Sequence, residues 1–233
     1  MECHICKKPI SGQYYADALG NKMCESHYQH DAVACSSCMG FSTKENPLPD
    51  GRYLCSICVG LALKPGESIE PIKATVIKAM STVGFGDLQM EKIPIEVVSA
   101  EQMAKIFNTS INPHNKGLIK VATGFLQKYS YTIYMLTYLN KIEMAGALAH
   151  EILHAWLIEN GVQMSQKYTE GFCNMGAYLM WNRLGSSLTK TYLKILHENP
   201  CPIYGDGFRE IHAMYEELGW EGLIKMVREK KLK

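Results

Sequence analysis

The segment Ala147-Leu-Ala-His150-Glu151-Ile-Leu-His154-Ala-Trp-Leu157 decides how this sequence is interpreted. It places two histidines four positions apart in an apolar, helix-forming context. Residues at i and i+4 project from the same face of a helix, about one turn apart. The segment therefore predicts a buried helix that presents His150 and His154 together to one metal ion, packed through an apolar face made of Met144, Leu148, Leu153 and Leu157.

The intervening glutamate gives this spacing a chemical meaning. Two histidines four positions apart, with a glutamate directly after the first, are typical of zinc peptidases, in which the glutamate acts as general base on the metal-bound water. A catalytic zinc also needs a third protein ligand and one open coordination position. We therefore expect Glu151 to be the general base and a further carboxylate to complete the metal site.

Glu170 is the expected third ligand. It lies sixteen residues after His154, in the first turns of the next predicted helix, so a turn near Gly161 would return it to the histidines. Glu159 is the rival carboxylate, but at i+5 from His154 it lies off the ligand face. A third histidine six positions after His154 is excluded, because position 160 is Asn.

The cysteines are concentrated at the N-terminus, where seven of the nine lie within the first 58 residues. They form closely spaced pairs, and zinc takes four such ligands tetrahedrally in closed structural sites. His4 and His30 lie nearby but do not keep the two-residue spacing. The spacing predicts two structural zinc ions besides one catalytic zinc ion, with the ligands Cys3, Cys6, Cys24 and His27 in one site and Cys35, Cys38, Cys55 and Cys58 in the other.

Hydrophobic periodicity predicts an α+β protein in two parts. Residues 1–62 form a zinc-dependent module with too few large aliphatic residues for a core of its own, and the Pro-Gly linker at 64–66 precedes a peptidase-like domain at 67–233. Strands are expected at 93–98, 117–123 and 131–139, and helices at 67–83, 100–107, 142–160, 167–184, 187–198, 206–218 and 220–231.

Three polar residues near the C-terminus are candidates for stabilising charge on the reacting oxygen. Tyr204, Arg209 and His212 lie in or after the stretch Pro202-Ile-Tyr-Gly-Asp-Gly-Phe-Arg209. We select Tyr204 as the catalytic candidate, although the sequence leaves the choice among the three open. The same stretch also fits an ordinary loop with Asp206 as the N-cap of the next helix.

Several other residues have both a functional and a structural interpretation. The strands at 116–123 and 131–139 can offer an edge to an extended peptide substrate or form plain core strands. The tyrosines at 129, 131, 134 and 138 fit a specificity surface or ordinary strand packing. We interpret Cys173 as a buried thiol, Trp156 and Trp181 as core residues, and His114 and His197 as surface residues.

Charge and hydropathy argue against some partners and locations. Lys plus Arg (24) nearly balance Asp plus Glu (23), which does not favour a nucleic-acid or membrane surface. No apolar run reaches the roughly 18 residues that a membrane span needs, and the N-terminus lacks the pattern of a signal peptide. We therefore expect a soluble, cytoplasmic protein whose partners are protein substrates, with no nucleic acid and no membrane.

Four motifs together resemble a known family. They are Cys24-x2-His27 with His30-Asp-Ala before Cys35-x2-Cys38, the segment 148–156, Glu170-Gly-x-Cys173, and 202–209. This pattern resembles the plant ubiquitin-activated LIM-domain metallopeptidases that limit organ growth, here called the DA-one family. The resemblance covers nearly the whole chain.

The resemblance implies a LIM-like N-terminal module and a gluzincin-like peptidase domain, which combines a short β-sheet, an active-site helix and C-terminal helices. By this resemblance, His150, His154 and Glu170 correspond to the catalytic zinc ligands of the family, and Glu151 corresponds to its catalytic glutamate. It also implies ubiquitin-linked regulation. Plant members have ubiquitin-interacting segments and a LIM domain ahead of the LIM-like module, and this sequence is expected to be a minimal form.

Two other functions compete with an endopeptidase. The chain can be an adaptor whose LIM-like module recruits partners while the peptidase domain is inactive. The intact set of His150, His154, Glu151 and an available third carboxylate favours the enzyme. A nucleic-acid-binding zinc protein fits the cysteine pairs but not the balanced charge, and salt-sensitive retention on DNA would support it.

Overall fold

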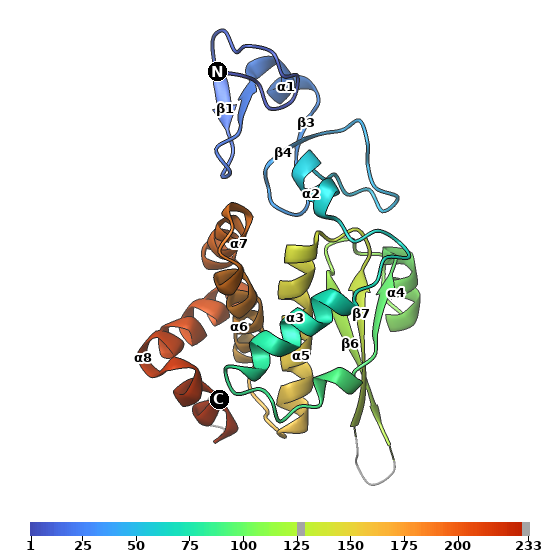
Figure 1. Ribbon diagram of the computed structural model, residues 1–233, viewed down its shortest axis with the longest axis vertical. Helices are drawn as coiled ribbons and strands as arrows, with labels where there is room; N and C mark the ends of the chain where they lie inside the picture. Colours follow the sequence, from blue (N-terminus) through green and yellow to red (C-terminus); the bar gives the residue numbers. More distant parts are fainter. Residues whose placement is uncertain (125–128, 230–233) are drawn as a thin grey trace.

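A computed structural model describes residues 1–124 and 129–229 and shows a mixed α/β protein with small sheets, in agreement with the predicted class (Figure 1). The N-terminal elements are β1 (Tyr14–Ala16), β2 (Lys22–Cys24), α1 (Glu25–His30), β3 (Ala32–Ala34), β4 (Phe41–Thr43) and α2 (Ser56–Leu61). The predicted helix at 220–231 has its last two positions outside the described residues. Within the described ranges, no helix is long and apolar enough to cross a membrane.

The remaining elements follow the order predicted from periodicity. They are α3 (Glu70–Ser81), the 3-10 turn η1 (Met90–Lys92), β5 (Ile95–Val98), α4 (Ala100–Phe107), β6 (Gly117–Thr123), β7 (Tyr129–Leu136), α5 (Lys141–Glu159), α6 (Gln166–Leu184), α7 (Ser187–Glu198), η3 (Pro202–Asp206) and α8 (Gly207–Arg228). Gly219 has a non-helical backbone and divides α8 where the sequence predicted a break. The π-helical turn η3 occupies a stretch for which an ordinary loop was one of the two interpretations.

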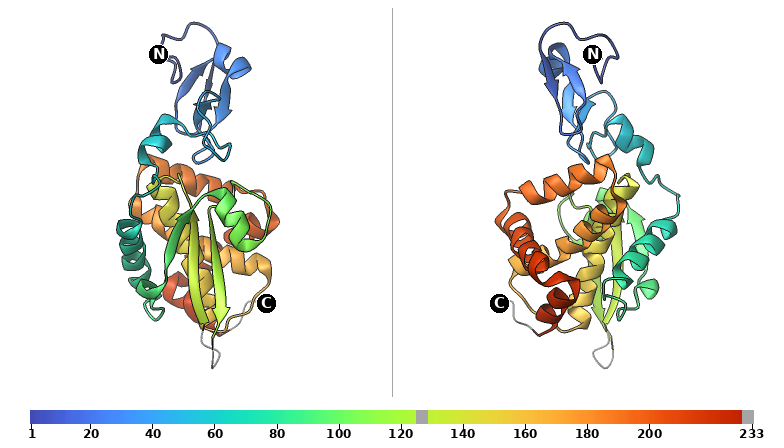
Figure 2. Two further views of the ribbon diagram at one scale, coloured as in Figure 1. Left: turned by 90° about the vertical axis from the view of Figure 1, so that its right-hand side faces the viewer. Right: turned by 60° about the vertical axis from the view of Figure 1, so that its left-hand side comes forward.

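A three-stranded sheet covers one side of the helices (Figure 2, left). Its order is β5-β7-β6, in which β7 pairs parallel with β5 and antiparallel with β6. Buried side chains alternate along β7 at Tyr131, Ile133 and Met135, as expected for a strand with one face on a core. Because β7 is central, β6 is an edge strand of this sheet among the described residues.

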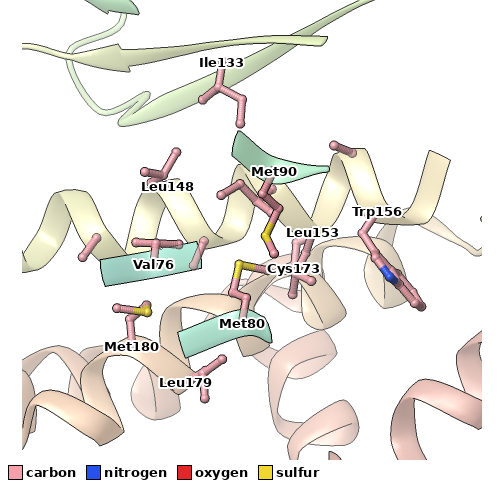
Figure 3. Packing of buried hydrophobic residues seen from close by; sticks show 14 of the residues in the cluster. Val76, Met80, Met90, Ile133, Leu148, Leu153, Trp156, Cys173, Leu179 and Met180 are labelled. Carbon is pink, nitrogen blue, oxygen red and sulfur yellow. The ribbon is translucent and has the colours of Figure 1, made fainter. Parts of the chain in front are cut away.

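The main core lies where α3, α5 and α6 meet the sheet. Figure 3 shows Val76 of α3 between Leu148 of α5 and Met180 of α6, and Met80 lies one turn further along α3. Each of these side chains is at most 1% exposed, so their burial supplies the main driving force that holds α5 in place.

Local signals define both ends of the α5–α6 hairpin. The Asn140 side chain accepts hydrogen bonds from the backbone N–H groups of Ile142 and Glu143, which caps α5. The connection to α6 turns at Gly161, whose φ is 59°, a conformation that glycine adopts without strain. Ser165 then caps α6 through the N–H of Tyr168. The two helices consequently run side by side in opposite directions.

The second half of the N-terminal region is joined to the α5 side of the molecule. Backbone hydrogen bonds connect Leu63 with Leu139 and Tyr138, and Arg52 donates to the carbonyl oxygen of Thr137 at 2.7 Å. Asn140 donates to Cys58 Sγ at 3.6 Å. The β1–β2 hairpin lies at the far end of the molecule (Figure 1). The predicted domain boundary at 64–66 stays a prediction.

Removing the two cysteine groups should therefore have unequal effects. We expect Cys38→Ser/Cys58→Ser to lower the Tm of the whole chain by about 10 °C, because a lost metal beneath Asn140 removes about 3 kcal/mol or more from the main core. Cys3→Ser/Cys6→Ser should loosen only the β1–β2 end and leave the main transition nearly unchanged. Calorimetry measures both, and equal shifts would contradict this asymmetry.

Candidate metal centre

The structure brings His150, His154 and Glu170 together. His150 Nε2 lies 3.1 Å from His154 Nε2 and 3.2 Å from Glu170 Oε2, and the third separation, His154 Nε2 to Glu170 Oε2, is 3.6 Å. Ligand atoms around a tetrahedral zinc with bonds of about 2.0–2.1 Å lie about 3.3 Å apart. The three groups therefore fit one zinc ion and leave a fourth position for water.

A hydrogen-bond chain from α6 orients His150. Its Nδ1 lies 3.0 Å from Asn174 Oδ1, and Asn174 Nδ2 donates to the carbonyl oxygen of Tyr204 at 3.1 Å. Because the amide oxygen of Asn174 can only accept, Nδ1 of His150 carries the proton and Nε2 keeps its lone pair for a metal. Asn174 was not among the predicted site residues, although its position four residues after Glu170 on a predicted helix places it on the same helix face.

The carboxylates of this centre have opposite pKa shifts. Burial pushes the pKa of Glu170 up, but the side-chain and charge interactions with the neighbouring rings of His150 and His154 outweigh burial and hold the pKa at about 2. Glu170 is therefore an ionised ligand. Glu151 is 7% exposed, and burial raises its pKa despite the nearby histidines. A raised pKa makes Glu151 a stronger base, which suits proton transfer near neutral pH.

Neither alternative third ligand displaces Glu170. The Tyr131 hydroxyl donates to Glu159 Oε2 at 2.7 Å, so Glu159 is used elsewhere. Cys173 is fully buried, as expected, and its sulfur lies within 4.8 Å of the ligand nitrogens of His150 and His154. Burial raises the pKa of Cys173, and Cys173 is absent from the lining of the adjacent cavity, whereas Glu170 lies in that lining.

A cavity of about 560 Å³ lies over the metal centre. The edge strand β6 forms one wall, and α5, α6 and α7 form the other, while Ser37 of the N-terminal region lies in the lining. A Cβ atom at Gly117 of β6 would lie 2.9 Å from Glu151 Cγ, so glycine lets the edge strand approach the glutamate. The cavity is therefore open to a chain lying along β6.

The structure distinguishes the three oxygen-stabilising candidates. Tyr204 lines the cavity, and burial raises its pKa, so its hydroxyl keeps the proton it would donate. The Arg209 guanidinium already donates hydrogen bonds to the carbonyl oxygens of His197 and Asn199 and to the carboxylate of Asp206. His212 is outside the lining and packs on Tyr178 and Phe208.

Three minor expectations need correction. Asp206 makes no capping hydrogen bond, because its carboxylate pairs with Arg209 in the first turn of α8. His197 is half-buried against Phe208 and His212 instead of lying on the surface. Trp181 is half-buried and lines the cavity instead of lying within the core. Its indole N–H donates a hydrogen bond to the carbonyl oxygen of Ile142. His114 is exposed as expected, at the cavity wall.

The eight N-terminal metal-ligand candidates also assemble as two groups. Within each group the sulfur and ring-nitrogen atoms lie within 4.8 Å of one another, and the members are Cys3, Cys6, Cys24 and His27 in one and Cys35, Cys38, Cys55 and Cys58 in the other. His27 Nδ1 lies 2.8 Å from Asp31 Oδ1, which leaves Nε2 available to a metal. These thiolate and imidazole donors fit zinc.

Comparison with known proteins gives two relatives. The chain is 23% identical to the protein DA1-related 7 of Arabidopsis thaliana over 97% of this chain and 52% of the relative, and 24% identical to the protein DA1 of the same plant over 81% of this chain and 47% of the relative. The resemblance to the DA-one-type family is confirmed. This chain spans about half the length of the DA1 relatives it matches, and the aligned part includes the region of His150, His154 and Glu170. Neither a family model nor a solved structure matches it.

The segments 170–173 and 202–209 touch through their glycines. A Cβ atom at Gly171 would lie 2.3 Å from the carbonyl oxygen of Gly207, and one at Gly207 would lie 2.2 Å from that of Lys167. Since side chains cannot occupy these spaces, α6 and the start of α8 approach each other backbone to backbone. This contact fixes the turn of α6 that carries Glu170.

Substitution of Gly171 should therefore act on the metal site. We expect Gly171→Ala to push α6 from α8 and to weaken zinc binding at the histidine site about 10–100-fold, as the loss of a supporting contact does. Competition with a zinc chelator measures the affinity. Gly86→Ala is the matched control, because its Cβ would meet only an ordinary contact at 3.9 Å. Unchanged affinity in Gly171→Ala would contradict the proposed support.

Proposed function

We propose that this chain is a zinc-dependent endopeptidase that hydrolyses peptide bonds of intracellular proteins. The observation that carries the proposal is the set of three ligand atoms at tetrahedral spacing, with the buried Glu151 beside them at the floor of a cavity. The layout we infer is a LIM-like module followed by a gluzincin-like domain. The similarity to DA1 proteins supports the same family.

The chain's own residues supply the proton transfers. His150, His154 and Glu170 would hold a zinc ion, which would supply a Lewis acid and lower the pKa of the attacking water toward about 7. A Glu151 carboxylate oxygen accepts the water proton and delivers it to the nitrogen of the leaving amine. The Tyr204 hydroxyl donates a hydrogen bond to the carbonyl oxygen as negative charge develops there.

The edge strand β6 offers a place for the substrate backbone. The part of β6 that lines the cavity, Gly117 to Ile119, pairs with β7 on one side only. An extended peptide can add to such an edge through main-chain hydrogen bonds, which gives affinity with little dependence on sequence. This arrangement fits an endopeptidase that acts on extended segments of protein substrates.

The N-terminal module has a docking or regulatory role in this proposal, with two structural zinc ions. Ubiquitin-linked regulation stays a prediction from the family resemblance. The competing proposal is an adaptor that binds partners through the LIM-like module and has an inactive peptidase domain. Metal content and hydrolysis distinguish the two.

Glu151→Gln tests the general base. The amide cannot accept the water proton, so we expect hydrolysis of an unstructured protein such as casein to fall about 10²–10⁴-fold, with zinc content unchanged. Elemental analysis after dialysis gives the metal count and fluorescent casein gives the rate. His150→Ala/His154→Ala should lose one zinc of three and all hydrolysis.

These variants also decide between enzyme and adaptor. A wild type that holds two zinc ions, with the same count in a folded His150→Ala/His154→Ala variant, would contradict a catalytic zinc at this centre and favour the adaptor. Full hydrolysis by Glu151→Gln would assign the base to another residue.

Tyr204→Phe tests the oxygen-stabilising donor. Removing one such hydroxyl should lower kcat about 10²–10³-fold and leave KM nearly unchanged, since the contact strengthens only as charge develops. Tyr129→Phe is the control, because Tyr129 is exposed and outside the cavity lining. A change confined to KM would instead assign Tyr204 to substrate binding.

A further inference from the structure

One carboxylate in the cavity has no part in the proposed reaction. Glu143 lies on α5 seven residues before His150, and residues i, i+4 and i+7 share one helix face, so Glu143, Ala147 and His150 all line the cavity. Seven residues of helix span about 10 Å. Glu143 therefore lies about 10 Å along the cleft from the metal centre, toward the N-terminal module.

The carboxylate of Glu143 is buried and has a resident cation. Its side chain is 1% exposed; Ser37 donates to Oε2 at 2.5 Å, and Lys116 Nζ lies 2.5 Å from Oε1. The Lys116 side chain is 42% exposed, so this lysine approaches the carboxylate from the solvent side. A buried carboxylate without a cation is strongly destabilised. Any group that replaces Lys116 beside Glu143 must therefore also carry a positive charge.

The surrounding surface suits a long aliphatic chain that ends in a cation. Trp181 and Tyr192 stack with ring centroids 5.0 Å apart, and both line the cavity. Ala147 and Ala177 leave room above the helices. A lysine or arginine stem can pack on such a surface while its charged end reaches a carboxylate.

A hydrogen-bond chain holds Glu143 ready for this role. Asn140 donates to Ser37 Oγ at 2.7 Å and to the Tyr192 hydroxyl, and Ser37 donates to Glu143. With its hydrogen-bonded oxygen fixed from the module side, Glu143 directs Oε1 toward Lys116. The carboxylate position is therefore set before a substrate arrives.

We propose that Glu143 selects a lysine or arginine side chain of the peptide substrate, and that Lys116 fills this subsite when no substrate is bound. The proposal rests on the proposed peptidase function. Exchange of one cation for another keeps Glu143 paired, and the half-exposed Lys116 returns to water at little cost. At about 3.3 Å per extended residue, 10 Å places the selected side chain within about three residues of the scissile bond.

The first experiment is digestion of a proteome-derived peptide library prepared by cleavage after glutamate. We expect lysine and arginine to be enriched at one position within three residues of the cleaved bond. Two fluorogenic peptides that differ only in lysine or norleucine at that position then give a selectivity ratio of kcat/KM values. Absence of positional preference, or a preference for acidic residues, would overturn the proposal.

Variants of the pair should change that ratio in opposite directions. Glu143→Gln should lower it about 10–100-fold, the effect of losing a hydrogen bond to a charged group. Lys116→Met removes the resident cation and should lower the KM of the lysine peptide. Lys120→Met on β6, which directly follows Lys116, and Glu198→Gln on α7 are controls outside the lining and should leave the ratio unchanged. Equal effects on both peptides would contradict selection by Glu143.

Two further measurements keep the outcome decisive. If Glu143→Gln does not fold, Ser37→Ala removes the hydroxyl that orients the carboxylate and should lower the ratio by a smaller factor. If no peptide is hydrolysed, the peptidase proposal fails, and calorimetric binding of the two peptides to the wild-type protein still tests the subsite. Equal affinity for the lysine and norleucine peptides would then overturn it.

Discussion

The helices α5 and α6 approach so closely that a Cβ atom at Gly176 would lie 2.7 Å from the carbonyl oxygen of Ala149. At Gly146 the Trp181 ring fills the space that a side chain would need, 2.5 Å from a Cβ position. This close contact brings the first turns of α6 against the middle of α5. Glu170 reaches His150 and His154 only because the glycines allow it, so the candidate metal centre depends on this backbone contact.

The same contact desolvates the charged groups. His150, His154, Glu170 and Glu151 come from two helices whose other faces are packed into one apolar core, so these polar groups lie at its edge beneath the cavity. Buried polar groups need partners, and Asn174 and Tyr204 supply them from α6 and η3. Because Asn174 belongs to a helix packed in the core, its hydrogen bond holds the His150 ring in one orientation, as a metal site requires.

The hydrophobic periodicity of the sequence predicted most of the helices and strands. A helix with one apolar face and a strand with alternating burial can each be recognised from their own residues, without knowledge of tertiary contacts. The edge strand was predicted at its observed bounds, Gly117–Thr123, and α5 and α6 within two residues. The close approach of His150 and His154 could be predicted from the sequence, because helix geometry relates i to i+4. The sequence did not show which of Tyr204, Arg209 and His212 lines the cavity, because this depends on how η3 packs against α6. Asn174, Ser37 and Glu143 meet their partners only through tertiary contacts.

The cysteine-rich region contacts the cleft, which the spacing of its cysteines along the sequence did not indicate. Closed four-ligand groups have no open position for chemistry, which suggests a separate docking module. However, Cys58 accepts a hydrogen bond from Asn140, the residue that caps α5, and Ser37 contacts Glu143 inside the cavity. The second cysteine group therefore supports both the start of the metal-centre helix and one end of the cleft. A partner that binds this region would act on the cleft directly, because the side chain of Asn140, the cap of α5, is hydrogen-bonded to Cys58 Sγ.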